Sequence, residues 1–205
     1  LKYADEKLSC GPNARAMLYK AIARLGLSAF EAEARVVWTT GYSIPMVLYQ
    51  PFDLVPFDFE YAAVDLVASG RAAQSLAASN RLGYPVDTCS AHRVALGAQA
   101  LGFFPPADLL ISTTHFCDGK PKCNEIFEER YHVPFHLIDV PLEKDESALD
   151  YVESQLREVF SLLGRLAGKV ANESLLIEPI RNYNRVLSLM MEINRLRSQK
   201  PAPYI

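Results

Sequence analysis

The sequence predicts an α/β fold in which a parallel sheet is flanked by helices, with extra long helices at the C-terminal end. Two observations predict the sheet. Short apolar runs alternate with longer helical runs, as in βαβ units. The runs "DLLIS" and "FHLIDV" are almost continuously apolar, which is typical of parallel strands buried on both faces. A third observation, the change to helical periodicity after Pro141, predicts the long helices.

The elements of the sheet follow one another along the chain. The run over residues 13–28 predicts a first helix that ends near Gly26. An alanine-rich run predicts one helix over residues 60–80. The other elements are strands over 35–42, 54–60, 107–114 and 133–141, and helices over 90–103 and 123–132. Ligands bind beyond the carboxyl ends of such strands, so we expect a site where "TTGY" and "TTHFCDGK" follow theirs.

Two amphipathic helices are predicted after residue 145. Apolar residues recur at steps of three and four, and the acidic run "DESALD" stands near the start of the first helix. Stripes of this kind usually face a core, so we expect both to be packed against one. The stripes are formed by Leu149, Val152, Leu156, Val159, Leu163 and Leu166, and by Ile180, Tyr183, Val186 or Leu187, Met190, Ile193 and Leu196.

The composition of the 205 residues excludes several classes of protein. Half of the residues are hydrophobic and 22% are charged, the balance of a globular protein with a real core. The net charge of -3 gives no electrostatic case for nucleic acid. No apolar run approaches the roughly 18 residues of a membrane span. The start of the sequence carries charges where a signal peptide has an apolar core, so we expect a cytoplasmic protein.

The four cysteines are too sparse for a disulfide scaffold, which also favours a reducing cytosol. The run "THFCDGKPKC" places Cys117 and Cys123 just after a predicted strand. Their spacing is not a usual zinc spacing, and no second pair completes a four-ligand site. Burial as small hydrophobic residues is the plain alternative. Cys117 lies in a polar loop, which argues against a core role, and Cys123 is predicted to open the following helix, where the dipole favours a thiolate.

Cys89 lies in "PVDTCSAHR", directly before a predicted helix. One helix and one strand separate it from Cys117, and equivalent loops of a parallel α/β sheet gather at one edge, so the two thiols can meet there. Soft thiolate ligands suit iron–sulfur clusters. Two or three cysteines leave such a cluster one ligand short, and an open iron position is a place where a substrate oxygen can bind.

Other polar residues lie near these cysteines. Of the four histidines, His92 and His115 are close enough in sequence to orient or protonate a ligand, although each alone is more often structural; the other two are His132 and His136. The loop "WTTGYSIP" offers a turn at Gly41 and small hydroxyl residues, which suit either a ligand contact or a plain strand-to-helix turn. Neither GxGxxG nor GxxxxGK[ST] occurs, so the sequence carries no usual ATP-binding loop.

Three segments in order resemble the 2-hydroxyacyl-CoA dehydratase and benzoyl-CoA reductase family. They are "VVWTTGYSIPMVLYQPFDLVPFDFE", "DTCSAHRVALGAQALGFFPPADLLISTTHFCDG" and "YHVPFHLIDVPLEKDESALDYVESQLREV". The shared order is a glycine loop plus IP, a Cys-Ser-x-x-Arg segment, a strand ending at Cys, and a strand ending in Asp-Val-Pro. The resemblance covers roughly residues 35 to 200. It implies a flavodoxin-like α/β fold with added helices.

The resemblance also implies the cofactor and its ligands. Subunits of this family bind a [4Fe-4S] cluster through cysteines, and Cys89 and Cys117 match two of these ligands. A third cysteine belongs to a second α/β domain that this chain lacks. Cys123 matches no ligand of the family, and Cys10 lies outside the matched region. The division that follows is an N-terminal helical segment (1–34), an α/β cluster-binding domain (35–145) and a helical extension (146–205) leading to the missing domain.

The implied function is that of an iron–sulfur subunit of an acyl-CoA dehydratase or reductase. In the family, a separate ATP-dependent iron–sulfur activator injects one electron, and the clusters of two homologous sister subunits pass it to a CoA thioester. Dehydratases then lose the 2-hydroxyl group from a ketyl radical, whereas reductases reduce an aromatic ring. From its glycine turn and small hydroxyl residues, we expect the loop of Thr40, Gly41, Tyr42 and Ser43 to face the substrate.

Three alternatives stay open at this point. The chain can be a cluster-less scaffold that keeps the fold and the interface, which the missing third ligand favours. It can resemble the double-cubane relatives, which act on small molecules other than CoA esters. It can also be a flavodoxin-like small-molecule binder with purely structural cysteines.

Overall fold

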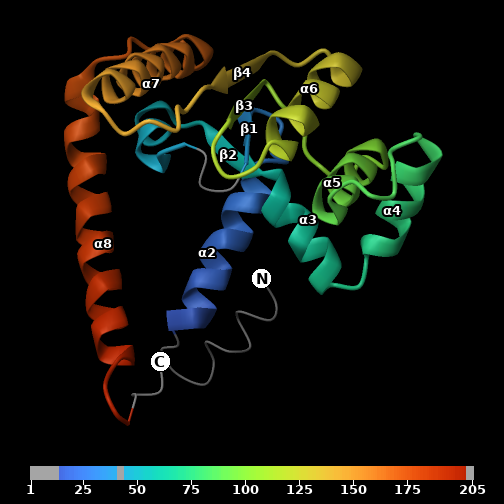
Figure 1. Cartoon of the computed structure of the whole chain (residues 1–205), viewed down its shortest axis with the longest axis horizontal. Coiled ribbons are helices and arrows are strands. Elements are labelled where there is room, and N and C mark those ends of the chain that lie inside the picture. Colours follow the sequence, from blue (N-terminus) through green and yellow to red (C-terminus); the bar gives the residue numbers. More distant parts are fainter. Residues whose placement is uncertain (1–13, 41–43, 202–205) are drawn as a thin grey trace.

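The computed structural model describes residues 14–40 and 44–201 and is built around a four-stranded parallel sheet. The strands are β1 (Val36–Thr39), β2 (Val55–Asp58), β3 (Leu109–Thr113) and β4 (Phe135–Ile138), in the order β2-β1-β3-β4 (Figure 1). All three pairings are parallel, and Trp38 is aligned with Phe57 on one side and Leu110 on the other. This order is that of the first four strands of a flavodoxin-like sheet, so the predicted fold class is confirmed.

One face of the sheet is covered by α3 (Phe59–Ala68), α5 (Ser90–Ala100) and α6 (Gly119–Tyr131). Trp38 is at the centre of this core and is 1% exposed. Its ring centroid lies 5.0–6.1 Å from those of four phenylalanines, Phe57, Phe59, Phe104 and Phe127. The helix α4 (Ala72–Arg81) packs against α5. This aromatic core fixes α3, α5 and α6 against the strands.

The opposite face is covered by two short 3-10 helices, η1 (Met46–Leu48) and η2 (Gln50–Phe52), and by α7 (Glu146–Ala167). Val37 and Ile111 point to this side and are fully buried. They meet Val159 and Leu163 of α7, so the middle of the stripe predicted for this helix does face a core. The division at residue 145 stays a prediction, although α7 forms one layer of the α/β sandwich.

Two predicted boundaries are wrong. The single helix expected over residues 60–80 is two helices, because the chain turns between Ala68 and Ala72, where Gly70 has φ of +74°. A left-handed conformation suits glycine and ends a helix. The helix expected to start at Cys123 starts at Gly119, so Cys123 lies in the second turn of α6 and not at its start.

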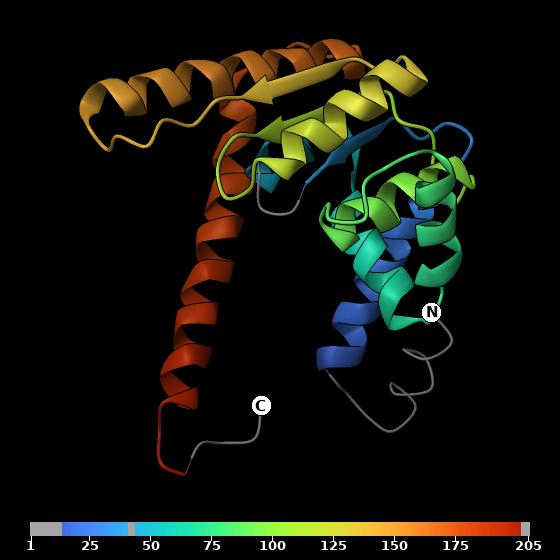
Figure 2. The same ribbon diagram turned by 45° about the vertical axis from the view of Figure 1, so that its right-hand side comes forward.

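Helices α2 (Ala14–Ser28) and α8 (Ile177–Arg197) extend away from the sandwich (Figures 1 and 2). A 3-10 helix, η3 (Glu173–Leu176), joins α7 to α8. The expectation that the second long stripe packs against a core is wrong for this chain, since α8 contains no buried residue. No helix among residues 14–40 and 44–201 is both long and apolar enough to cross a membrane.

Candidate functional site at the carboxyl edge of the sheet

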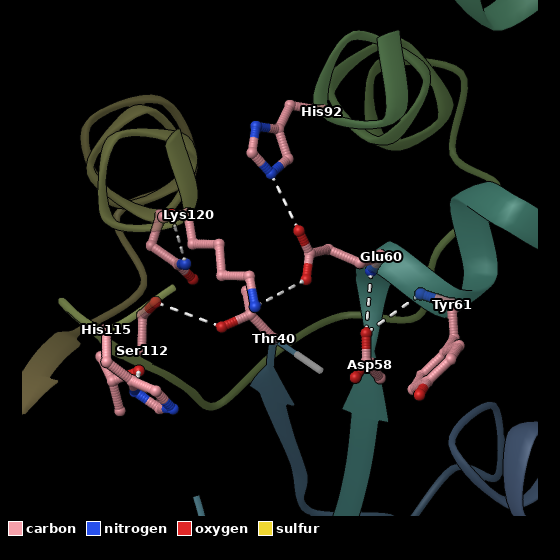
Figure 3. Close-up of polar contacts among 10 residues, drawn as sticks. Thr40, Asp58, Glu60, Tyr61, His92, Ser112, His115 and Lys120 are labelled. Atoms are coloured by element: carbon pink, nitrogen blue, oxygen red, sulfur yellow. Dashed lines mark hydrogen bonds and ion pairs between the residues drawn. The ribbon is translucent and has the colours of Figure 1, made fainter. Parts of the chain in front are cut away.

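The strand order reverses between β1 and β3, which is where ligands bind in open α/β sheets. Thr40 directly follows β1, and Ser112 is the fourth residue of β3. Their hydroxyl oxygens are 3.2 Å apart, and both side chains are buried. This pair ties the two central strands together at the floor of the candidate site (Figure 3).

Asp58, at the end of β2, starts α3. Its Oδ1 accepts hydrogen bonds from the backbone N–H groups of Glu60 and Tyr61, both at 3.0 Å, which caps the helix. Burial raises the pKa of Asp58 from 3.8 to about 6, although these hydrogen bonds oppose the change. The cap sets the direction of α3 and points its first turn, with Glu60, at the edge of the sheet.

Glu60 contacts two other helices through its two carboxylate oxygens (Figure 3). Oε1 lies 2.9 Å from Nε2 of His92 on α5, and Oε2 lies 3.4 Å from Nζ of Lys120 on α6. The side chains of His92, Lys120 and Glu60 are 3%, 11% and 21% exposed, so the contacts are largely shielded from water. Burial alone would raise the pKa of Glu60, but the hydrogen bond with His92 and the charge of Lys120 outweigh it and lower the pKa.

Cys89 and Cys117 both lie at the starts of helices at this edge. Cys89 is the N-cap of α5, and Cys117 lies in the loop between β3 and α6, two residues before Gly119. A Cβ atom on Gly119 would lie 2.8 Å from Nδ1 of His92 and 3.5 Å from Sγ of Cys117, so the His92 ring and the Cys117 sulfur border the same small space. His92, three residues after Cys89, lies in the first turn of α5. The start of α5 and the loop before α6 therefore approach each other at Gly119, and the predicted meeting of the Cys89 and Cys117 thiols stays a prediction.

The three cysteines with described structure differ in exposure. Cys89 is exposed and Cys117 is partly exposed, whereas Cys123 is 2% exposed within the aromatic core. Burial, followed by the charges of Glu60 and Cys89, raises the pKa of Cys123 far above that of a free thiol. Cys123 is thus a neutral core residue, and the prediction that the helix dipole activates its thiol is wrong.

The residues at this edge fit two ligands of a thiolate-bound metal cluster. Two free, accessible thiols stand at the positive ends of neighbouring helices, where negative charge is favoured. Within the described ranges, no group of three or more His, Cys, Asp or Glu side chains is arranged to hold a metal ion. A cluster held by Cys89 and Cys117 would therefore need further ligands from outside residues 14–40 and 44–201.

The loop after β3 presents an aromatic pair beside Cys117. The His115 and Phe116 rings are 4.1 Å apart, and Nδ1 of His115 is 2.7 Å from the Thr113 hydroxyl. Burial and then the charge of Lys120 lower the pKa of His115, which favours its neutral imidazole. Phe116 is 82% exposed and has φ of +72°, which is a rare conformation for a bulky residue.

The predicted site residues have different outcomes. His92 and His115 are at the site, whereas His132 ends α6 and His136 lies within β4. Thr40 is buried beneath the site, and its contact with substrate stays a prediction. The rest of the predicted loop, Gly41, Tyr42 and Ser43, lies outside the described residues, as does Cys10.

Sequence reasoning missed Glu60 and Lys120. Both stand in the first helical turn after a strand, at residues 2 and 7 beyond the ends of β2 and β3. Charged residues in such turns of a parallel sheet face the ligand edge, and this was the available signal. Their pairing across 60 positions depends on the tertiary fold and leaves no local pattern.

One family match places this chain among known proteins. The family model described as "2-hydroxyglutaryl-CoA dehydratase, D-component" matches residues 42–205. The matched region includes Glu60, Cys89, His92, Cys117 and Lys120. A comparison with curated proteins gave no match.

Proposed function

Since the chain belongs to the 2-hydroxyglutaryl-CoA dehydratase D-component family, we propose that it is the iron–sulfur subunit of an acyl-CoA dehydratase. The substrate class is a 2-hydroxyacyl-CoA thioester, and the reaction is loss of the 2-hydroxyl group as water. A ring reductase of the benzoyl-CoA type uses the same electron delivery and is the second possible reaction. The free thiols at the site suit a reducing cytoplasm.

One observation carries the proposal. Cys89 is the N-cap of α5 and Cys117 lies two residues before α6, at the switch point of a parallel sheet, and the His92 ring and the Cys117 sulfur border the same space beside Gly119. Thiolates suit iron–sulfur clusters, and the D-component match supports a multi-subunit dehydratase. We therefore assign Cys89 and Cys117 as two ligands of a [4Fe-4S] cluster.

The cluster, when bound, would supply a low-potential electron to the thioester. The chain's own residues supply the surroundings. Cys89 and Cys117 would be held at the N-terminal ends of α5 and α6, and the aromatic core excludes water from one side. Glu60 and Lys120 keep charged groups at this edge. The Thr40–Ser112 pair forms a polar floor.

Two partners follow from this proposal. A homologous sister subunit would complete the reaction chamber, and a separate ATP-dependent iron–sulfur activator would deliver the electron. The sequence contains no P-loop motif of its own, which supports an ATPase on another chain. A cluster bound by Cys89 and Cys117 would take its remaining ligands from outside the described residues, since no group of three or more His, Cys, Asp or Glu side chains among them is arranged to hold a metal ion.

Anaerobic reconstitution with iron and sulfide tests the assignment. The native protein should gain iron, sulfide and the broad visible absorption of a cluster, with an electron paramagnetic resonance signal after reduction. Cys89→Ala and Cys117→Ala should each lower the iron content at least several-fold. Cys123→Ala is the matched control, because this thiol is buried in the core, and it should keep the native iron content. Equal iron in all three variants would refute the ligand assignment.

A cluster-less scaffold is the alternative, and it is favoured by the lack of a three-ligand metal group among the described residues. Co-purification from an anaerobic host separates the two functions. A scaffold should bring down a cluster-bearing sister subunit while holding no iron itself. An iron-bearing subunit should keep its iron after the complex is separated under anaerobic conditions.

A further inference from the structure

The ion-pair network beneath the two thiols links three separate helices. Glu60 comes from the first turn of α3, His92 from the first turn of α5, and Lys120 from the first turn of α6 (Figure 3). Each oxygen of the Glu60 carboxylate contacts a different helix, at 2.9 Å for His92 and 3.4 Å for Lys120. A single side chain therefore joins α5 to α6 at their N-terminal ends.

The two residues that contact Glu60 each follow one of the two cysteines by the same number of positions in the sequence. His92 follows Cys89 by three residues, and Lys120 follows Cys117 by three residues. The backbone connects each pair tightly, since Arg93 N–H donates to the Cys89 carbonyl and Lys120 N–H donates to the Cys117 carbonyl. Movement of either helical turn relative to Glu60 would thus move the thiol that precedes it.

The packing leaves little freedom between the two helices. His92 is pinned on one side by Glu60, and on the other side it lies against Gly119, where a Cβ atom would approach Cε1 to 2.7 Å. Because the ring fills this space, the first turn of α6 lies directly against His92. The Glu60 carboxylate is the polar group that contacts the first turns of both helices.

We propose that Glu60 is a positioning residue, whose carboxylate holds the first turns of α5 and α6 in register and thereby sets the separation of the Cys89 and Cys117 thiols. The inference rests on the proposed function in one respect, namely that the two thiols held at this separation would act as a pair of cluster ligands. The separation itself is a property of the metal-free protein and can be measured without iron.

Cross-linking of the metal-free protein tests this inference. Dibromobimane becomes fluorescent only after both of its arms have reacted with neighbouring thiols. In a Cys10→Ser, Cys123→Ala background, the two remaining thiols should give a fluorescent product. Glu60→Ala should lower the rate of the second, cross-linking step by roughly 3- to 10-fold, while single alkylation by iodoacetamide stays within about twofold. Glu60→Gln keeps an acceptor for His92 and loses the charge opposite Lys120. Its cross-linking rate should therefore lie between that of the background protein and that of Glu60→Ala.

Controls keep the result specific. Glu125→Ala breaks an exposed pair with Lys122 within α6 and should cross-link at the background rate. If Glu60→Ala does not fold by circular dichroism, Lys120→Met, which removes one of the two contacts, carries the test and should still slow cross-linking. Background-rate cross-linking in the folded Glu60 and Lys120 variants would overturn the inference.

The two proposals fail in different ways. If the background protein itself gives no cross-link, the thiols are not neighbours, and both the cluster site and the inference are refuted. If cross-linking is independent of Glu60 but Cys89 and Cys117 hold iron, only the inference fails. If cross-linking depends on Glu60 and no cluster forms, the inference stands and the proposed function fails.

Discussion

Gly119 lies directly against the imidazole of His92, so closely that a Cβ atom would come within 2.7 Å of Cε1 and 2.8 Å of Nδ1. The two residues join the starts of α6 and α5. Gly119→Ala should push the helices apart and lower the free energy of unfolding by about 1–3 kcal/mol, the usual cost of overpacking. Urea unfolding monitored by circular dichroism measures this change.

Gly26→Ala provides the matched control for that prediction. Gly26 is within α2, and a Cβ atom there would meet no atom within 4 Å. The substitution should raise stability by about 0.5–1 kcal/mol, because alanine restricts the unfolded chain and favours helix. If both alanine variants were stabilising, the close approach of Gly119 to His92 would be contradicted.

Asp58 should make the protein less stable as the pH rises. Its pKa is raised by burial to about 6 in the folded protein, against 3.8 for a free side chain. Between these two pH values the folded state therefore binds more protons than the unfolded state. The contribution is present below about pH 4 and is lost as the pH rises through about 6. Asp58→Asn keeps an oxygen that can cap α3 and has no charge to bury. At pH 7 it should be more stable than the native protein by on the order of 2–3 kcal/mol.

Asp145 provides the opposite case for comparison. It caps α7 through the Ala148 N–H group, and that hydrogen bond lowers its pKa. Its contribution is therefore present at neutral pH and is lost as the pH falls through the lowered pKa. Asp145→Asn should therefore not be more stable than the native protein at pH 7. Measuring unfolding in urea at pH 4 and pH 7 for both variants checks the signs, and a gain confined to pH 4 for Asp58→Asn would contradict the prediction.

Much of the fold was predictable from sequence because its signals are local. The near-continuous apolar runs identified the parallel strands β3 and β4, and the alternation with helices identified the α/β class. Burial along the whole strand was right for β3 and wrong for β4, an edge strand of which only Ile138 is buried. The helix break at Gly70 was missed because alanine-rich composition on both sides outweighed one glycine. The exposed stripe of α8 was mistaken for a core-facing one, since periodicity shows that a face is apolar and does not show what covers it.

The candidate site was only half predictable. Cys117 could be placed at this edge because the loop after a parallel strand lies there. Cys89 was expected in such a loop too, but it lies between α4 and α5 and is at this edge because α5 begins there. The link between the two cysteines through Glu60 could not be predicted. Its carboxylate contacts His92, which is 32 positions away in the sequence, and Lys120, which is further still. Cys123 was predicted at the first position of its helix but lies one turn further in. At the first position its thiolate would be favoured, whereas one turn later the thiol is buried and neutral.

Phe116 should reveal backbone strain beside Cys117. Its φ of +72° is unfavourable for a bulky residue, and the ring is 82% exposed, so burial compensates little. Asparagine tolerates this conformation, whereas a β-branched residue does not. Phe116→Asn should therefore be more stable than Phe116→Val by about 1 kcal/mol in urea unfolding. Both variants lack the ring contact with His115, so that contact cancels, and equal stabilities would contradict the strained conformation.

Helix α8 should exchange its amide hydrogens much faster than α5 in the isolated chain. None of the residues from Ile177 to Arg197 is buried, whereas seven residues of α5, including His92 and Arg93, are buried. Helices gain most of their stability from packing, so a 21-residue helix without a packed face opens readily. Hydrogen–deuterium exchange followed by mass spectrometry should show full labelling of residues 180–197 well before residues 90–100. Equal protection of the two helices at low protein concentration would contradict the exposed state of α8.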